Sequence, residues 1–248
     1  MREAVDGYDA SAYGRDIASD YDDLYGAIPD TREAVACLAE LAGAGPVLEL
    51  GIGTGRLALP LAARGLEVHG VEASTEMVSE LRRKPGGAQM PVHVSSFDDY
   101  ELEQRFSLVV LALHTIYGLP SQDRQVRCFE TAARHLRPVG AFVIEASLID
   151  VGAFRAGQAV RPRFTSAGHV ELQVHRYDPV SQHLEWTNVH LSNGNVRLNS
   201  GRNQYASPHE FDLMGRIAGL RLRDRWGGWS REPFTAASTR HVSVYGEG

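Results

Sequence analysis

The chain of 248 residues is poor in cysteine, in long hydrophobic runs and in positive charge. Its two cysteines, Cys37 and Cys128, lie in apolar helical patterns and indicate buried free thiols, not a disulfide framework. No apolar run is long enough to span a bilayer, and the acidic, polar start lacks the basic and apolar regions of a signal peptide. These absences predict a cytoplasmic protein without a membrane partner.

An excess of basic residues is also missing, because the formal net charge is −6. Proteins that bind nucleic acids usually present a basic face that releases counterions from phosphates. The densest basic run, Arg82-Arg83-Lys84, is short and fits the last turn of a helix, where cations are favourable. We therefore expect no nucleic-acid partner.

Short apolar segments alternate with amphipathic ones in the first half of the chain. Strands are expected at 46–50, 66–71, 91–94, 106–112 and 141–146, and helices at 31–41, 56–64, 74–84 and 122–136. Strands that alternate with helices over short connections indicate a parallel, doubly wound sheet.

The pattern changes after residue 150, where alternating segments indicate antiparallel strands at 170–177, 184–191 and 196–205. The turn signals between them are Asp178-Pro179 and Asn193-Gly194. Ser207 and Pro208 then suit the first positions of a helix. Two further strands, 221–226 and 240–245, are expected to complete the first sheet as an antiparallel pair.

Tyrosines are concentrated near the start of the chain among many aspartates. Tyr13, Tyr21 and Tyr25 are spaced so that they fall near one face of a helix, which predicts an N-terminal helical lid. The predicted fold is α/β: a doubly wound, mainly parallel seven-stranded Rossmann-like sheet with an antiparallel β insertion and this lid. The predicted parts are the lid (1–30), the cofactor-binding core (31–150), the insertion (151–205) and a C-terminal helix with strands (206–248).

A glycine turn follows the first expected strand and lets a ligand approach the backbone closely. The glycines are Gly51, Gly53 and Gly55, and Arg56 stands where a dinucleotide fingerprint requires its third glycine. This departure argues against an NAD-dependent oxidoreductase. Glu49 precedes the turn, where it can receive a cation, and a carboxylate that ends the second strand can accept ribose hydroxyls.

Three segments together resemble the motifs of class I S-adenosylmethionine (SAM) dependent methyltransferases. Residues 47–56 resemble the first motif, 70–77 the second, and 136–141 the late L-x-P-G-G turn, from which Val139 departs. The resemblance covers roughly residues 44–147 and implies SAM as cofactor, S-adenosylhomocysteine as product and no metal. It implies cofactor contacts from Tyr13, Glu49, Gly51, Gly53, Gly55, Glu72, Ala73, Met77, Ser96, Phe97, Asp98 and Leu113.

The adenine contacts depart from those of many relatives, which carry an acidic residue at the position of Ser96. Asp98, or Phe97 with its backbone, is expected to take over the adenine amino group. His114 and Tyr117 follow the fourth strand, where the first is a candidate general base and the second a candidate to orient the acceptor. Simple packing remains the alternative for both.

The chain also resembles, more loosely, the small-molecule branch that contains aminosugar and lincosamide N-methyltransferases. The shared features are N-terminal tyrosines, an insertion after the fifth strand and a late helix preceded by Ser-Pro. This resemblance implies that Tyr13 contacts SAM and that Tyr21 lines the acceptor pocket, with packing in the core as the alternative.

The sequence therefore predicts methyl transfer to an amine or hydroxyl of a small molecule, in natural-product or antibiotic biosynthesis. The lack of a clear Asp/Glu cluster, and of metal-ligand spacing among the histidines of the insertion, favours N-methylation without a metal. The alternatives are an O-methyltransferase of a phenol or sugar and a non-catalytic SAM-binding protein. The acceptor, its reacting atom and the oligomeric state stay open, as does the insertion, which fits a pocket wall or a contact in a homo-oligomer.

Overall fold

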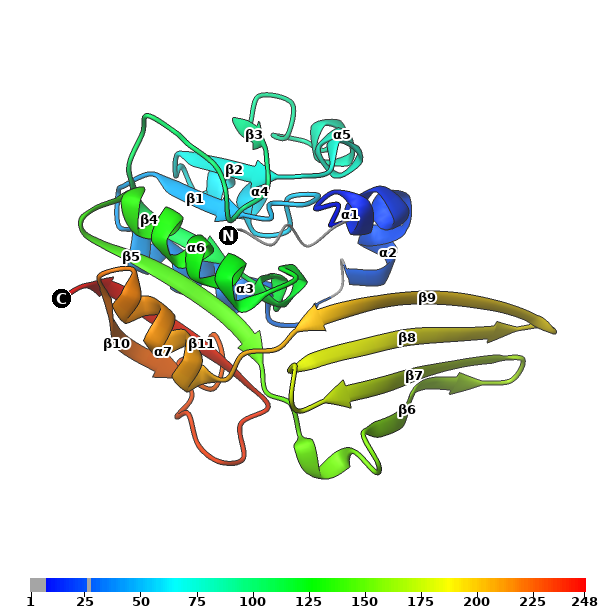
Figure 1. Cartoon of the computed structure of the whole chain (residues 1–248). Coiled ribbons are helices and arrows are strands. Elements are labelled where there is room, and N and C mark those ends of the chain that lie inside the picture. The colour runs from blue at the N-terminus through cyan, green and yellow to red at the C-terminus, as the bar shows by residue number, and fades with distance from the viewer. Residues whose placement is uncertain (1–7, 26–27) are drawn as a thin grey trace.

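A seven-stranded sheet forms the centre of the computed structural model, which describes residues 8–25 and 28–248 (Figure 1). The strand order is β10-β11-β5-β4-β1-β2-β3. The strands are β1 (Val47–Leu50), β2 (Val68–Glu72), β3 (Val92–Val94), β4 (Phe106–Leu111), β5 (Leu136–Ser147), β10 (Leu220–Trp226) and β11 (Arg240–Glu247). The first five run parallel and β11 is antiparallel to both of its neighbours, which confirms the predicted Rossmann-like fold.

Helices cover both faces of this sheet and form two hydrophobic cores. The helices are α3 (Thr31–Ala42), α4 (Ala58–Ala63), α5 (Thr75–Arg83), α6 (Gln122–Arg134) and α7 (Pro208–Ile217). One core joins α6 and α7 through residues such as Phe129 and Phe211, and the other joins α3 and α4 through Leu38 and Leu61. Neighbouring strand residues point into opposite cores, which explains why the central strands read as continuous apolar runs.

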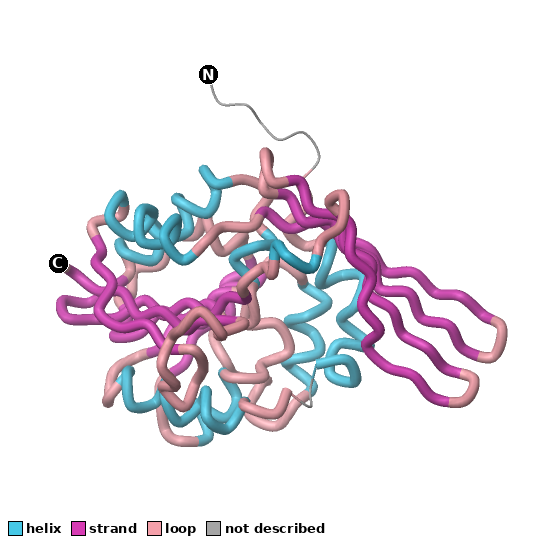
Figure 2. Tube along the Cα trace, turned by 90° about the horizontal axis from the view of Figure 1, so that it is seen from below, coloured by secondary structure: helices cyan, strands magenta, loops and turns pink. Residues whose placement is uncertain are grey.

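A second sheet extends away from this domain, as Figures 1 and 2 show. It has four antiparallel strands in chain order: β6 (Gln158–Ser166), β7 (His169–Asp178), β8 (His183–Ser192) and β9 (Asn195–Gln204). We call it the hairpin sheet. The sequence predicted its last three strands but not β6, an edge strand whose register shifts between Pro162 and Phe164. Proline cannot donate to the ladder and is tolerated at an edge, so the alternation that marks a strand is broken there.

The N-terminal lid consists of short pieces and not of one helix. They are α1 (Ala12–Ile17), a 3-10 turn (Ala18–Asp20) and α2 (Tyr21–Tyr25). Tyr13 and Tyr21 therefore belong to different helices, which corrects the single helical face expected from spacing; the Tyr25 side chain lies outside the described residues. Gly14 of α1 lies so close to α5 that an added Cβ would stand 2.5 Å from Ser74 Cβ. Further 3-10 turns span Thr115–Gly118 and Val151–Ala153.

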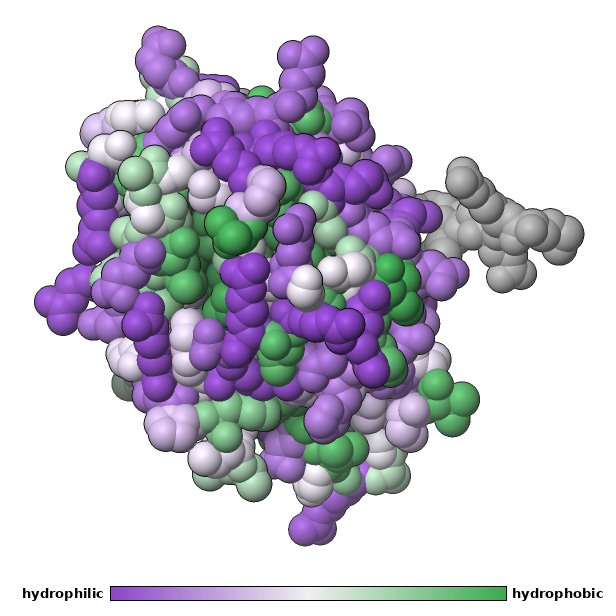
Figure 3. Space-filling model, turned by 90° about the vertical axis from the view of Figure 1, so that its left-hand side faces the viewer, coloured by the Kyte–Doolittle hydropathy of each residue, from purple (hydrophilic) through white to green (hydrophobic). Residues whose placement is uncertain are grey.

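The opposite end of the parallel sheet, toward the amino ends of the strands, alternates hydrophilic and hydrophobic side chains in small patches (Figure 3). Val139, near the start of β5, is 84% exposed and has a φ of 61°. This left-handed conformation is costly for a β-branched residue, whereas glycine, which the L-x-P-G-G turn carries here, adopts it freely. Among the described residues, no helix combines the length and apolar character needed to cross a membrane.

Candidate cofactor and acceptor site

The carboxyl ends of β1, β2 and β4 point toward the lid and the hairpin sheet (Figures 1 and 2). Ligands of open α/β sheets bind at this end of the strands. The glycine loop lies there, and Gly51, Gly53 and Gly55 have φ values of 67°, 54° and 88°. Side chains are strongly disfavoured in this conformation, so the loop presents bare backbone to a ligand.

Glu72, at the end of β2, joins the glycine loop to the start of α5. One carboxylate oxygen accepts the Gly53 N–H at 2.9 Å and the other accepts the Ser74 N–H at 2.9 Å. Ser74 in turn caps α5 by accepting the Met77 N–H at 3.2 Å, as its sequence position predicted. Burial raises the pKa of Glu72 in spite of these hydrogen bonds. Glu72 therefore stands where a ribose would lie, beside the loop that would hold the rest of the cofactor.

Glu49 lies beneath the glycine loop and is 5% exposed. Burial raises the pKa of its carboxyl to about 8, although Arg56 acts in the other direction. Its Oε2 is buried and has no hydrogen-bond partner among the described residues. A buried acceptor of this kind is costly unless a donor satisfies it. The ammonium of a SAM methionine moiety would be such a donor, so the residues present fit the cofactor that the sequence predicted.

The buried carboxyl of Glu49 gives a pH-dependent prediction. Its folded-state pKa of about 8 lies above the ordinary value of 4.5. The unfolded chain therefore loses this proton first, and the free energy of unfolding falls as the pH rises from about 4.5 to about 8. Glu49→Gln should raise the melting temperature of the ligand-free protein at pH 8 while weakening SAM binding by about 1–3 kcal/mol.

Melting curves at pH 5 and pH 8, with titration calorimetry at pH 8, test this prediction. The stabilisation should be small at the lower pH and large at the higher one. A variant with unchanged cofactor affinity would exclude Glu49 as the ammonium partner.

Two charged residues that the sequence did not single out fasten the lid to the glycine loop. Asp22 of α2 accepts the Thr54 hydroxyl at 2.7 Å and pairs with Lys84. Lys84 Nζ also donates to the Thr54 carbonyl at 2.8 Å. Partial burial opposes ionisation of Asp22, but the hydrogen bonds from Lys84 and Thr54 lower its pKa overall. The signal for this contact was absent from the sequence, because the three residues lie on separate elements.

The adenine side of the site differs from the expectation for Asp98. Its carboxylate, 1% exposed as a residue, accepts Arg124 N–H groups at 2.8 and 2.9 Å and an Arg127 N–H at 3.0 Å, and also bonds the Ser96 hydroxyl. Although burial opposes ionisation, Arg124, Ser96 and Arg127 lower the pKa of Asp98. Asp98 thus braces the loop after β3, and this geometry leaves Ser96 and Phe97 as the better candidates for the adenine contact.

Aromatic residues of the N-terminal segment lie on either side of the site. Tyr21 packs against the small core of Ile17, Ala18 and Met77, whereas Tyr13 is 45% exposed and meets the Trp186 ring edge-on at 6.5 Å between centroids. The implied roles, Tyr13 in contact with SAM and Tyr21 in the acceptor pocket, stay predictions. Tyr8, which the sequence did not assign, lies over Arg124 at 4.4 Å, and burial raises the pKa of its hydroxyl to about 12.

The loop after β4 has a strained backbone. Leu113 and His114 have φ values of 51° and 61°, an arrangement that non-glycine residues rarely adopt. Glu145 of β5 holds both residues: its carboxylate accepts the Leu113 N–H at 3.0 Å and its carbonyl accepts the His114 N–H at 3.2 Å. The loop also lies against the glycine loop, because a Cβ on Gly51 would stand 2.9 Å from the Thr115 side chain.

His114 itself is half-buried on this loop. Burial lowers its pKa, Glu145 raises it in part, and Arg240 lowers it. Arg240 of β11 donates to Glu145 at 3.1 Å and also pairs with Asp30 at the start of α3. The His114 Nδ1 has no hydrogen-bond partner among the described residues. The imidazole therefore stands beside the glycine loop on a backbone that Glu145 holds, and Arg240 in turn donates to Glu145. The sequence singled out neither Glu145 nor Arg240.

Tyr117 has a different placement from the one expected of a residue that orients the acceptor. It is buried, and its hydroxyl lies 2.8 Å from the Ser147 carbonyl and 3.2 Å from the Ala206 carbonyl. A phenol has one proton to donate, so these carbonyls occupy it. Tyr117 joins the end of β5 to the segment before α7, and its ring lies 5.4 Å from that of Tyr205, centroid to centroid. This geometry supports a role in packing.

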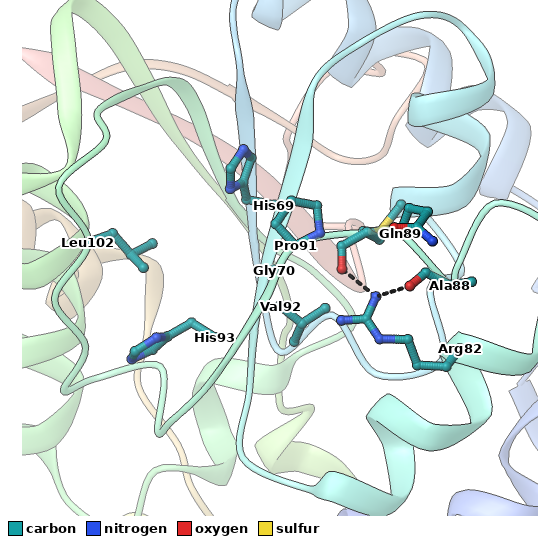
Figure 4. Close-up of a pocket in the computed structure, with 10 residues that line it drawn as sticks. His69, Gly70, Arg82, Ala88, Gln89, Pro91, Val92, His93 and Leu102 are labelled. Atoms are coloured by element: carbon teal, nitrogen blue, oxygen red, sulfur yellow. Dashed lines mark hydrogen bonds between the residues drawn. The ribbon is translucent and has the colours of Figure 1, made fainter.

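A cavity of about 500 Å³ lies away from this site, beside the edge strand β3 (Figure 4). Arg82 crosses it and donates to the Gly87 carbonyl at 2.7 Å and to the Ala88 carbonyl at 3.2 Å, and it also bonds the Met90 carbonyl. Its guanidinium thus holds the connection between α5 and β3. We therefore attribute this cavity to the packing of that connection and not to a ligand site.

The fold and the site together define a class I SAM-dependent methyltransferase. A family model described as a methyltransferase domain matches residues 47–140. The chain is 40% identical to the CcbJ methyltransferase of Streptomyces caelestis, with a TM-score of 0.90 over 97% of this chain and 100% of that structure. The chain belongs to the class I SAM-dependent methyltransferases.

Two further relatives extend the comparison. A cypemycin N-terminal methyltransferase from a Streptomyces species is 28% identical over 201 residues, which are 80% of this chain and 81% of that protein. The SAM-bound amino pentose methyltransferase CalS10 of Micromonospora echinaspora is 19% identical over 96% of this chain and 92% of that structure, with a TM-score of 0.61. The second likeness concerns the fold alone. SAM is the cofactor of this family and supplies the methyl group from its sulfonium.

Proposed function

We propose that this methyltransferase N-methylates an amine of a small molecule in natural-product biosynthesis, with His114 as the general base. The observation that carries the proposal is the half-buried His114, which lies on a strained loop against the glycine loop. Because burial lowers its pKa, the ring is neutral near pH 7 and can accept a proton. A weak base of this kind suits an ammonium group, which needs only to lose a proton before it attacks.

The acceptor would lie between the lid and the hairpin sheet. Trp186 and Tyr13 meet there, and Tyr177 extends toward Tyr205, with ring centroids 6.3 Å apart. Such aromatic walls bury the apolar part of an acceptor and exclude water from the reacting atoms. Tyr13 and Tyr21 would close the site from above, since α1 packs against α5.

One relative supports an amine as the reacting group. The cypemycin enzyme, 28% identical to this chain, is named for methylation of an N-terminus. A sugar hydroxyl would need a stronger base than a histidine of lowered pKa, whereas an acidic phenol would not. O-methylation of a phenol is therefore the competing outcome of the test.

A transfer assay with methyl-labelled SAM tests the proposal. The panel should contain amino sugars, amino acids, peptides with free N-termini and matched phenols. We expect the labelled methyl group to appear in amines, and we expect the rate to fall as the pH falls through the pKa of His114. Label confined to phenols would contradict the proposal, and SAM binding without transfer to any acceptor would favour a non-catalytic role.

A further inference from the structure

Three potential metal ligands converge near the outer end of the hairpin sheet, away from the methyl-transfer site. His169 and Glu171 stand two residues apart on β7, so their side chains share one face. His190 on β8 lies directly opposite Glu171 in the antiparallel register. Side chains in these relations have neighbouring Cβ atoms and can reach one point above the sheet.

The distances between the three groups are close to those of a metal site. Glu171 Oε1 lies 3.1 Å from His169 Nε2 and 3.2 Å from His190 Nδ1. One ligand atom from each residue falls within 4.8 Å of the other two. Zinc bonds of about 2.0–2.2 Å in a tetrahedron separate neighbouring ligand atoms by roughly 3.3 Å. Small side-chain rotations would therefore suffice for all three atoms to bind one ion.

We propose that His169, Glu171 and His190 bind one Zn²⁺-like transition-metal ion. Two imidazoles and a carboxylate form a donor set that suits zinc, with a fourth position open to water. The side chains are partly shielded, with exposed fractions of 35%, 31% and 16% in that order. The Phe164 ring lies edge-on to His169, with centroids 5.5 Å apart, and adds an apolar wall.

The position of the cluster indicates a structural role for the ion. It would link β7 to β8, next to β9, where Arg197 is paired with His190 in the register. Arg197 reaches Asp20 of the lid at 3.5 Å. The ion would thus stiffen the part of the hairpin sheet that the lid contacts, without taking part in methyl transfer. The sequence predicted no metal, because His190 joins the other two only through strand pairing.

Calorimetric titration of the full chain with ZnCl₂, after treatment with a chelator, tests the site. We expect one Zn²⁺ per chain. His190→Asn keeps a side-chain N–H that can face Glu171 but removes the imidazole ligand. Since changes at groups that only support a ligand cost about 10–100-fold in metal affinity, this variant should bind Zn²⁺ at least about tenfold more weakly.

His183→Ala is the matched control, because His183 lies on the same strand but on its other face. It should bind Zn²⁺ as the unmodified chain does. Equal melting temperatures of His190→Asn and the unmodified chain in chelator would show that folding is intact; if they differ, Glu171→Gln provides the second test. The proposal would be overturned if the unmodified chain did not bind Zn²⁺, or if His190→Asn and Glu171→Gln bound it as tightly as the unmodified chain does. These titrations need no methyl acceptor, so their outcome is separate from that of the transfer assay.

Discussion

Replacing His114 by asparagine should lower kcat about 100- to 10,000-fold, the range that a positioned general base contributes. Asparagine is the suitable replacement because it tolerates the left-handed backbone, here with a φ of 61°. The affinity for S-adenosylhomocysteine should stay close to that of the unmodified enzyme. Steady-state rates with the best amine of the transfer assay, together with calorimetry, measure both quantities. A kcat equal to that of the unmodified enzyme would reduce His114 to a packing residue.

Glu145→Gln tests a residue of β5 that positions the loop of His114 without itself accepting the proton. The carboxylate of Glu145 raises the pKa of His114 against the stronger effect of burial, so its loss should lower that pKa further. His114 acts when it is unprotonated, and activity is lost as the pH falls through its pKa. The acid limb of the kcat profile should therefore move to lower pH in this variant. An acid limb that does not move would show that another group controls it, since Arg240 and His241 of β11 remain in place.

The second large effect is expected at Glu72. Glu72→Ala removes a half-buried acceptor and should weaken SAM binding by about 1–3 kcal/mol, or roughly 5- to 150-fold in Kd. Part of this loss would come from the glycine loop, because Glu72 also holds the Gly53 and Ser74 N–H groups. Calorimetry with SAM and S-adenosylhomocysteine measures the change.

Glu76→Ala provides the control for Glu72. Glu76 lies in the first turn of α5 and accepts the Ser74 hydroxyl at 2.9 Å, but it is exposed. Its removal should leave the Kd nearly unchanged. Equal affinities for the Glu72 variant and the unmodified enzyme would remove Glu72 from the cofactor site and with it the assignment of the ribose position.

Local patterns were enough to predict the core of the fold and the cofactor loop. The glycine turn, the caps at Ser74 and Ser207 and two of the three turns of the hairpin sheet depend on residues that are adjacent in sequence. Their physical signals, such as a positive φ or a capping hydroxyl, can be recognised without knowledge of distant contacts. The glycine loop and the caps thus lie where the sequence predicted them, and the contacts of the predicted residues with SAM stay a prediction.

The missing parts depend on contacts between distant elements. Glu145 reads as one residue of a buried strand, and only the pairing of β5 with β4 brings it to Leu113. Asp98 reads as a free acceptor until Arg124 of α6 is placed beside it. The break of the lid between α1 and α2 likewise follows from docking on α5, which helical spacing does not contain. Contacts between elements that are distant in sequence determine these three features, and a single sequence does not show those contacts.

The joint made by Asp22, Thr54 and Lys84 bears on how fast the enzyme can work. These contacts tie the lid to the glycine loop, so we expect them to part before bound product can leave. We expect release of S-adenosylhomocysteine to limit kcat. Since an ion pair at the surface is screened by dissolved salt, kcat should rise with ionic strength.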